Sequence, residues 1–491
     1  MQFPLKLKNL VAGEWVGNPD GGPGGGMTSL DPADQERILA HVPAMGPQDV
    51  KAAIDAAASA LPSWRATPSV ERGKLLFRVA GLIRERAEEL RDLISFEMGK
   101  THGEAGIEVE RSAEMLEFYA GIGRLPYGDL IPDRRPGVSA WTVHEPLGVV
   151  LAITPWNDPL MVPCRKIAPA LISGNTVVLK PSPDTPAIAL ILAQMFVEAG
   201  LPAGVLNTVT GDVSGWGTVL TDDPRIGGVT FTGSTATGKY LRRALAGGRA
   251  RLQTEMGGKN SAVLLADADV DGALKQLVPA IFGQTGQRCT AVSRLLVHRS
   301  ILGEVEQKLA ALAGQVQVGS ASNEATTMGP VVNERQRSKV LELIGSAREE
   351  GARVAFGGAP LSEGPYGRGC FVQPTVLTGV SSAMRIWNEE VFGPVVAVLA
   401  FDALDEAIAL ANDTEYGLAA GVFTNDLTAA HRFVASIETG QAVINLPPSG
   451  WDVHQPFGGF KDSGSPFKEH GLDGLAFYTR IKTVAMQLAA Y

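Results

Sequence analysis

Cys289 is the residue whose surroundings best suit chemistry. It is one of three cysteines in 491 residues, and its neighbours in FGQTGQRCTA (282–291) are mostly small or polar. A cysteine kept for packing usually lies among aliphatic residues, whereas a nucleophilic thiol needs space, oxyanion donors and a nearby base or positive charge. The local sequence leaves both interpretations open, a covalent nucleophile and a buried structural thiol.

Composition limits what the rest of the chain can be. At 491 residues it is long enough for two or three domains, and 45% hydrophobic with 19% charged residues is typical of a soluble globular protein. A net charge of −9 without a Lys/Arg-rich run argues against nucleic acid or membrane as a partner. We see no membrane span and no signal peptide. Three scattered cysteines favour a reducing cytoplasm.

Two blocks of alternating strands and helices follow a mainly helical segment at 48–121. Short apolar runs there are typical of buried parallel strands. The first block has expected strands at 148–153, 175–180, 204–210 and 227–232, and helices at 160–172, 185–199 and 235–246. The second has expected strands at 261–266, 295–298, 395–401 and 419–424, and helices at 270–282, 301–314, 334–350 and 404–411. This alternation predicts an α/β fold with two parallel sheets.

Polar and glycine-rich segments come directly after three strands of the first block. Ligands of parallel sheets bind beyond the carboxyl ends of the strands. Pro155–Asn157, Lys180–Ser182 and Gly233–Ser234 would all lie at that edge. The sequence therefore predicts a ligand site there.

Seven motifs stand in order along the chain: TPWN (154–157), LKPS (179–182), FTGSTATG (231–238), TEMGGKN (254–260), GQRC (286–289), EEVFGPV (389–395) and PFGGFKDSG (456–464). Their identity, order and spacing resemble the aldehyde dehydrogenase superfamily, over nearly the whole chain. The resemblance implies two Rossmann-like parallel-sheet domains, one cofactor-binding and one catalytic, plus a small β oligomerisation arm. The implied boundaries are 1–122 and 146–256 for dinucleotide binding, 257–465 for catalysis, and 123–145 with 466–491 for the arm and C-terminal strand.

The resemblance makes Cys289 the nucleophile of an aldehyde oxidation. Because an aldehyde carbon has no electron pair with which to expel hydride, a thiolate adds first, and the hemithioacetal oxyanion collapses to a thioester as hydride leaves. The Cys289 N–H and the Asn157 amide would hold the oxyanion, and Glu255 would activate the water that hydrolyses the thioester. The structural alternatives are that Asn157 is a turn residue after Pro-Trp and that Glu255 is a solvated glutamate at a strand end. No metal is implied.

The cofactor implied by the resemblance is NAD or NADP. Lys180 would contact the adenosine ribose, Glu390 the nicotinamide ribose, and the helix that opens after Ser234 the pyrophosphate. Lys180 could instead be a solvated strand end, and Phe392 a core residue. The expected cofactor residues are Thr154, Trp156, Lys180, Ser182, Gly211, Gly233, Ser234, Glu390 and Phe392.

Two positions depart from the family pattern. Pro183 stands where NAD-specific members often carry a glutamate that repels a 2′-phosphate, and Asp184 follows it. We therefore expect dual use of the two cofactors or no fixed preference. Many members read SGxGRE where this chain reads SGSPFKE (463–469), so no role is expected for Glu469.

The expected substrate residues follow Asn157, flank Cys289 or lie in the loop at 445–455: Met161, Arg165, Arg288, Thr290 and Trp451. Arg165 and Arg288 could bind a substrate carboxylate in bidentate fashion, or pair with Asp158 or a glutamate instead. Trp451 could line the pocket or simply pack. A neutral or aromatic aldehyde is slightly preferred, with a semialdehyde as the close alternative.

Family members are usually dimers or tetramers, so we expect a homodimer or homotetramer acting on a small-molecule aldehyde. An arm at 124–144, with an edge strand at 139–144, would pair with a C-terminal strand near 477–486 to extend the sheet of a neighbouring subunit. Two other functions stay open. One is a coenzyme A-acylating dehydrogenase, against which Glu255 argues because acyl-transferring relatives often lack this carboxylate. The other is a catalytically silent protein of the same fold, which would be expected to have lost Cys289, Glu255 or Asn157.

Overall fold

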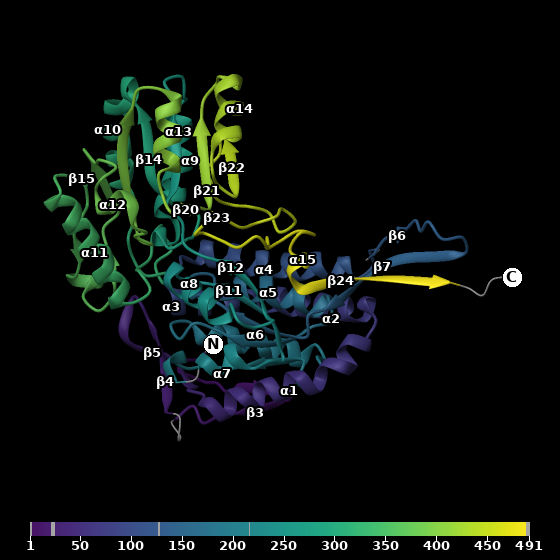
Figure 1. Ribbon diagram of the computed structural model, residues 1–491. Helices are drawn as coiled ribbons and strands as arrows, with labels where there is room; N and C mark the ends of the chain where they lie inside the picture. Colours follow the sequence, from purple (N-terminus) through teal and green to yellow (C-terminus); the bar gives the residue numbers. More distant parts are fainter. Residues whose placement is uncertain (1, 21–24, 126–127, 216, 488–491) are drawn as a thin grey trace.

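The computed structural model describes residues 2–20, 25–125, 128–215 and 217–487, and it is organised around two parallel sheets (Figure 1). In Figure 1 one lobe, coloured purple to teal, holds the N-terminal half of the chain. The other lobe, mostly green, holds most of the second half, and a narrow arm projects away from both. The predicted α/β fold with two parallel sheets is confirmed. The exact domain boundaries stay a prediction.

The first sheet has five parallel strands in the order β10-β9-β8-β11-β12. Its strands are β8 (Val149–Ile153), β9 (Thr176–Lys180), β10 (Leu206–Thr208), β11 (Ile226–Thr232) and β12 (Arg251–Glu255). Its helices are α5 (Met161–Ile172), α6 (Pro186–Glu198), α7 (Gly217–Asp222) and α8 (Thr235–Leu245), with a 3-10 turn at Val213–Gly215. β9 is buried throughout, as expected for a strand covered on both faces. Every predicted strand and helix of this block is confirmed.

The N-terminal segment adds a helical layer to this lobe. It comprises α1 (Pro47–Ala66), α2 (Ser69–Glu85), α3 (Ala87–Met98) and α4 (His102–Ile122), preceded by β1 (Leu5–Lys6), β2 (Asn9–Val11), β3 (Glu14–Val16), β4 (Gly26–Asp31) and β5 (Asp34–Pro43). Leu76 of α2, Leu116 of α4 and Ile167 of α5 share one buried core. The helices α2 and α4 thereby pack against α5.

The second sheet has seven strands in the order β15-β18-β19-β14-β13-β21-β22, and only β15 runs antiparallel to its neighbour. The strands are β13 (Asn260–Leu264), β14 (Val292–His298), β15 (Arg353–Phe356), β18 (Thr375–Thr378), β19 (Val395–Phe401), β21 (Ala419–Phe423) and β22 (Gln441–Ile444). The helices are α9 (Val270–Phe282), α10 (Leu302–Ala313), α11 (Glu334–Glu349), α12 (Arg385–Asn388), α13 (Leu404–Asn412) and α14 (Leu427–Ser436), with 3-10 turns at Gly283–Gly286, Arg299–Ile301 and Gly364–Tyr366. The four-residue strands β15, β18 and β22 were not predicted, because so short a run carries little periodicity.

The arm is a three-stranded antiparallel sheet in the order β24-β7-β6. It comprises β6 (Leu130–Ile131), β7 (Val138–Pro146) and β24 (Thr479–Gln487), which follows the short helix α15 (Leu475–Tyr478). The predicted edge strand at 139–144 is wrong, because β7 is the central strand. β24, which matches the C-terminal strand expected near 477–486, pairs with it within the same chain from Thr479–Pro146 to Gln487–Val138. Residues 126–127 and 488–491 of the predicted arm lie outside the described residues.

Two small antiparallel pairs complete the strands of the described residues: β16 (Pro360–Leu361) with β17 (Phe371–Val372), and β20 (Tyr416–Gly417) with β23 (Phe460–Lys461).

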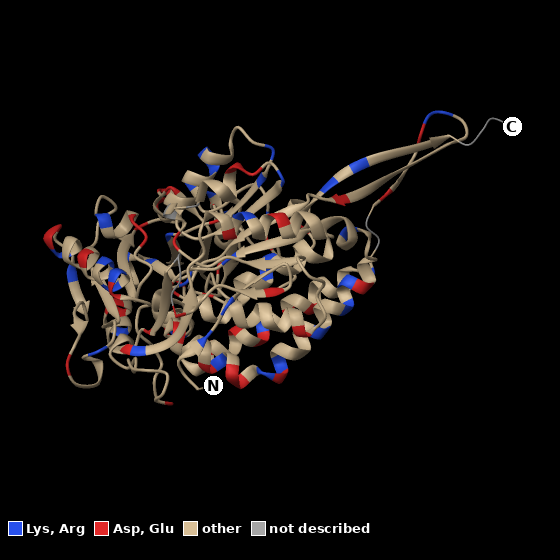
Figure 2. Cartoon of the chain, turned by 90° about the horizontal axis from the view of Figure 1, so that it is seen from below, with Lys and Arg blue, Asp and Glu red and all other residues tan. Residues whose placement is uncertain are grey.

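Figure 2 shows Lys and Arg mixed with Asp and Glu over the visible face. Exposed ion pairs such as Arg84 of α2 with Glu110 of α4, at 2.7 Å, contribute little stability each. None of the described helices combines the length and apolarity needed to cross a bilayer.

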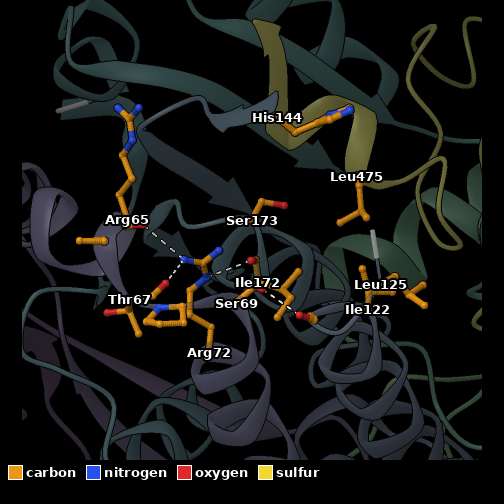
Figure 3. A pocket seen from close by; sticks show the side chains of 13 residues that line it. Arg65, Thr67, Ser69, Arg72, Ile122, Leu125, His144, Ile172, Ser173 and Leu475 are labelled. Atoms are coloured by element: carbon orange, nitrogen blue, oxygen red, sulfur yellow. Dashed lines mark hydrogen bonds between the residues drawn. The ribbon is translucent and has the colours of Figure 1, made fainter. Parts of the chain in front are cut away.

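A cavity of about 320 Å³ lies at the root of the arm, between the ends of α1 and α5 (Figure 3). Arg72 lines it and donates to the carbonyl oxygens of Thr67 and Ile172, which follow or end those two helices. These carbonyl groups are helix-end acceptors that need a donor. Because none of the predicted site residues lines this cavity, it is distinct from the site predicted by the sequence.

Candidate active site

The loop that carries Cys289 has an unusual backbone. Gln284, Thr285 and Gly286 adopt successive positive φ angles of 50°, 59° and 66°. Such conformations are costly for non-glycine residues and persist only where the surroundings enforce them. The Gln284 N–H donates to Glu104 at 2.6 Å, and the Thr285 hydroxyl donates to the Gly329 carbonyl at 2.9 Å. The loop is therefore held in place before any substrate arrives.

Cys289 is half-buried, whereas Cys164 and Cys370 are buried, and all three thiols are free. Its side chain packs against a small buried cluster of Leu418, Ala419 and Phe457, and Trp451 packs against the same cluster. Burial raises the pKa of the Cys289 thiol to about 12, with Arg165 opposing that shift. Because a raised pKa favours the protonated thiol at neutral pH, thiolate formation requires a proton acceptor or added positive charge.

Glu255 ends β12, and only 2% of it is exposed. Neither of its carboxylate oxygens has a hydrogen-bond partner among the described residues. Burial raises its pKa well above the ordinary value, the nearby Glu469 adds to the shift, and Lys166 opposes it. A Cβ at Gly458 would come within 2.5 Å of Glu255 Oε1, so only glycine leaves room for this carboxylate. An uncommitted carboxylate of raised pKa is suited to act as a general base.

Asn157 lies in the connection between β8 and α5 and is 6% exposed. Its Nδ2 donates to Asp158 Oδ2 at 3.3 Å. An amide nitrogen carries two N–H groups, so one remains for a ligand. Asp158 also acts electrostatically on Cys289, as Glu255 does, so these groups share one site.

Glu469, for which the sequence predicted no role, is buried beside Glu255. It accepts from Lys166 Nζ at 2.6 Å and from Arg165 Nη1 at 3.2 Å, both on α5. Sequence reasoning also missed Lys166, whose Nζ donates to the Thr230 hydroxyl at 2.9 Å. A signal was present, because adjacent cations in an otherwise apolar helix need a buried carboxylate.

The predicted cofactor residues of the first lobe gather at the carboxyl edge of its sheet. The Thr154 N–H donates to the Lys180 carbonyl at 3.1 Å, and the Gly233 N–H donates to the Glu255 carbonyl at 3.1 Å. Ser234 caps α8 by accepting from the Thr237 N–H. Burial lowers the pKa of Lys180 to about 8. Gly211, with a φ of 134°, follows β10 at the same edge.

Ser182, Pro183 and Asp184 form the turn after Lys180. The Asp184 N–H donates to the Ser182 hydroxyl at 3.3 Å. The Asp184 carboxylate accepts from Asn333 Nδ2 at 2.8 Å, and the Arg335 guanidinium lies 3.7 Å from it. The carboxylate that follows Pro183 is therefore engaged by the second lobe.

The second lobe contributes Glu390 and Phe392 to the cofactor edge. Glu390 Oε1 accepts from the Gly258 N–H at 3.0 Å. Phe392 has a φ of 54°, and its ring meets the Trp156 ring edge to face, with centroids 5.3 Å apart. Predicted cofactor motifs from both lobes thus meet at one point. The Thr154 hydroxyl has no hydrogen-bond partner among the described residues. Together with the N-terminus of α8 at this edge, it suits a polar, anionic ligand such as a dinucleotide.

The predicted substrate residues differ in their freedom to bind a ligand. Arg288 donates to Gln284 Oε1 at 2.8 Å and lies 3.7 Å from Glu104, so it stabilises the nucleophile loop. Arg165 pairs with Glu469 and lies over the Phe457 ring, but its Nε has no partner among the described residues. Trp451 Nε1 is likewise unpartnered. Met161 begins α5 and is half-buried, and Thr290 is buried beside Cys289.

Comparison with known proteins agrees with this geometry. The aldehyde dehydrogenase family profile matches residues 20–484. The chain is 39% identical over 477 residues to alpha-ketoglutaric semialdehyde dehydrogenase of Bacillus subtilis (strain 168), covering 97% of both chains. It is 40% identical over 484 residues to 2,5-dioxopentanoate dehydrogenase of Saccharolobus solfataricus, covering 98% of this chain and 99% of that one.

Among solved structures, betaine aldehyde dehydrogenase from Staphylococcus aureus in complex with NAD+ superposes with a TM-score of 0.95. The identity is 34%, and the match covers 98% of this chain and 95% of that chain. The chain therefore matches proteins of this family over nearly its full length, in both sequence and fold. The chain belongs to the aldehyde dehydrogenase family.

Proposed function

We propose that this enzyme oxidises a semialdehyde, a short aldehyde that also carries a carboxylate, to the dicarboxylic acid. The observation that carries the substrate class is Arg165, a buried cation near Cys289 whose Nε is unpartnered. A substrate carboxylate would satisfy that donor. Semialdehydes are also the named substrates of the two relatives described above. Of the two substrate classes expected from the sequence, these observations favour the semialdehyde.

Cys289 is proposed to add to the aldehyde carbon as the thiolate, after the thiol proton has passed to solvent water. The carbonyl π electrons move to oxygen, and the Cys289 N–H and the free N–H of Asn157 stabilise the oxyanion. Losing one such donor typically costs about 10²–10³ in rate. Collapse of the oxyanion expels hydride and leaves a thioester on Cys289. A bound NAD+ or NADP+ supplies the hydride acceptor.

Glu255 is proposed to complete the turnover. Its bare carboxylate takes a proton from water, the hydroxide attacks the thioester carbonyl, and Cys289 leaves as thiolate. Buried cations at Lys166 and Arg165 oppose the rise in its pKa, which keeps the anionic form accessible. The free acid, rather than an acyl group on coenzyme A, is the expected product.

Cofactor binding is proposed to use the edge between the lobes, with Lys180 and Glu390 at the two ribose rings. Because the Asp184 carboxylate already accepts from Asn333, it is engaged elsewhere and is not proposed to select the 2′-hydroxyl of NAD. Use of both NAD and NADP follows from this arrangement.

The arm is proposed to form a homodimer or homotetramer. Leu130 and Ile481 are 83% and 66% exposed on its strands, and burying such side chains against another copy is favourable. A reducing cytoplasm, inferred from the cysteine usage, stays a prediction.

The substrate class is tested by comparing 2,5-dioxopentanoate with pentanal, which has the same number of carbons but no distal carboxylate. We expect kcat/KM at least about 100-fold higher for the semialdehyde, because a site built for a polar group rejects an analogue that lacks it. Equal values would contradict the assignment. Product analysis with and without coenzyme A separates hydrolysis from acyl transfer.

A further inference from the structure

Asp158 follows Asn157 directly and occupies a polar junction that the proposed chemistry does not use. Its side chain is 20% exposed, and its two oxygen atoms have different partners. Oδ2 accepts from Asn157 Nδ2 at 3.3 Å. Oδ1 accepts from Lys100 Nζ at 2.6 Å and from Gln284 Nε2 at 3.1 Å. One carboxylate therefore joins the oxyanion amide to the loop that carries Cys289.

Lys100 makes Asp158 rigid. The Lys100 side chain is fully buried between α3 and α4, and it contacts Glu108 Oε2 at the same distance of 2.6 Å. Glu108 Oε1 in turn accepts from the Leu160 and Met161 N–H groups at 2.8 and 3.1 Å, where α5 begins. Hydrogen bonds to both side chains and backbone thus fix the connection from Asn157 to α5.

The two N–H groups of the Asn157 amide have different roles in this geometry. An oxyanion hole is effective when its donors are fixed before the charge develops, because reorientation during the reaction removes the advantage. A free amide can rotate about its side-chain torsions, whereas one with an N–H bound to a fixed acceptor cannot.

We propose that Asp158, anchored by Lys100, is a positioning residue that holds one N–H of Asn157 so that the other is fixed for the oxyanion. Asp158 itself touches neither substrate nor cofactor in this assignment. The proposal rests on the oxyanion role proposed for Asn157. It adds a residue of this chain to that role and predicts how the residue can be separated from Cys289 and Glu255.

Asp158 has a second measurable consequence, which needs no turnover. Four charged groups act on Cys289: Arg165 lowers the pKa of its thiol, and Asp158, Glu255 and Glu390 raise it. Removing the charge of Asp158 must therefore increase the thiolate fraction at a given pH.

The experiment compares Asp158→Ala with Asp158→Asn in the full-length enzyme. The alanine variant removes both charge and acceptor, and the asparagine variant keeps an acceptor oxygen. Both leave Lys100 paired with Glu108, so both are expected to fold. Stopped-flow measurement of the NAD(P)H burst with 2,5-dioxopentanoate should show at least about tenfold slowing in Asp158→Ala, a fraction of a lost oxyanion donor. Asp158→Asn should recover most of that rate.

Alkylation of Cys289 by iodoacetamide at pH 8 is the second readout. We expect both variants to react several-fold faster than the parent, and Cys289→Ala gives the background from other thiols. Asp223→Ala is the matched control, because Asp223 also forms an ion pair, with Arg225 at 2.6 Å, and has a 13% exposed side chain. It should change neither rate.

The outcomes separate this proposal from the proposed function. A parent enzyme that gives no burst with any aldehyde would refute the function, while the alkylation rates would still test the effect of Asp158 on Cys289. A burst in Asp158→Ala within twofold of the parent would overturn the positioning role. Equal slowing in Asp158→Ala and Asp158→Asn would do the same, because the charge and not the acceptor would then matter. Unchanged alkylation in both variants would refute the placement of Asp158 beside the thiol.

Discussion

Two buried charge clusters support helix α5, and they have opposite compositions. The acid-rich cluster (Lys100, Glu108, Asp158) lies at the start of the helix, and the base-rich cluster (Arg165, Lys166, Glu469) lies within it. The first joins two carboxylates to one ammonium group, and the second joins two cations to one carboxylate. Each cluster borders one of the groups proposed for catalysis, Asn157 in the first case and Glu255 in the second.

The difference shows how one helix can serve two chemical steps. The pKa of the Cys289 thiol, which burial raises, is lowered by Arg165 of the base-rich cluster and raised by Asp158 of the acid-rich one. Glu255 feels the base-rich cluster, whose Glu469 raises its pKa while Lys166 and Arg165 lower it. The pKa of the Cys289 thiol therefore depends on both clusters, which shift it in opposite directions. The pKa of Glu255 depends on the base-rich cluster.

The largest expected effect removes the atom on which both clusters act. Cys289→Ala should abolish NAD(P)H formation, because no other described thiol is accessible, while cofactor binding measured by fluorescence titration stays within about twofold. Residual turnover above about 10⁻³ of the parent would mean that neither cluster serves a Cys289 nucleophile.

Glu255→Gln should separate the two steps. The burst of NAD(P)H persists, because thioester formation does not use this carboxylate in the proposed scheme, but steady-state turnover falls by about 10²–10⁴. Rapid-quench and steady-state assays on the same preparation measure both. Loss of the burst would place Glu255 in the step assigned to Cys289.

Glu469→Gln should lower the stability of the protein more than a substitution in the acid-rich cluster does. It leaves Arg165 and Lys166 buried without the one carboxylate that forms an ion pair with them among the described residues, at a cost of about 3–5 kcal/mol in the free energy of unfolding. Asp158→Asn should cost less, because Lys100 keeps Glu108. Denaturant titration gives both values, and equal losses would contradict the comparison.

The pH dependence is the smallest effect and the finest test. Glu255 must be deprotonated to act as a base, and its folded pKa is raised, so steady-state turnover should fall as pH falls through a value above the ordinary 4.5. Below that point the decline is about tenfold per pH unit. In Glu469→Gln the midpoint should move to lower pH, because a carboxylate that raised the pKa of Glu255 is gone. A midpoint that stays fixed would show that the base-rich cluster does not control Glu255.

Much of the fold could be predicted from the sequence, because strands and helices alternate regularly and each has its own pattern of apolar residues. Strands β8, β9, β11 and β19 are continuous apolar runs, and the helices between them carry apolar residues at helical spacing. The arm shows the limit, because the alternation in β7 reports a strand but not the distant β24 that makes it central. The motifs at Asn157, Glu255 and Cys289 were identified by residue type and order.

What only the tertiary structure decided is which charges meet. Lys100 and Asp158, or Lys166 and Glu469, are distant in sequence, and no local pattern pairs them. Arg165 and Arg288 looked alike as carboxylate binders, but Arg165 is buried with an unpartnered Nε, whereas Arg288 donates its Nε to Gln284 of its own loop. The physical reason is that periodicity is a local property of the chain, whereas the desolvation and pairing of a charge depend on every element packed around it.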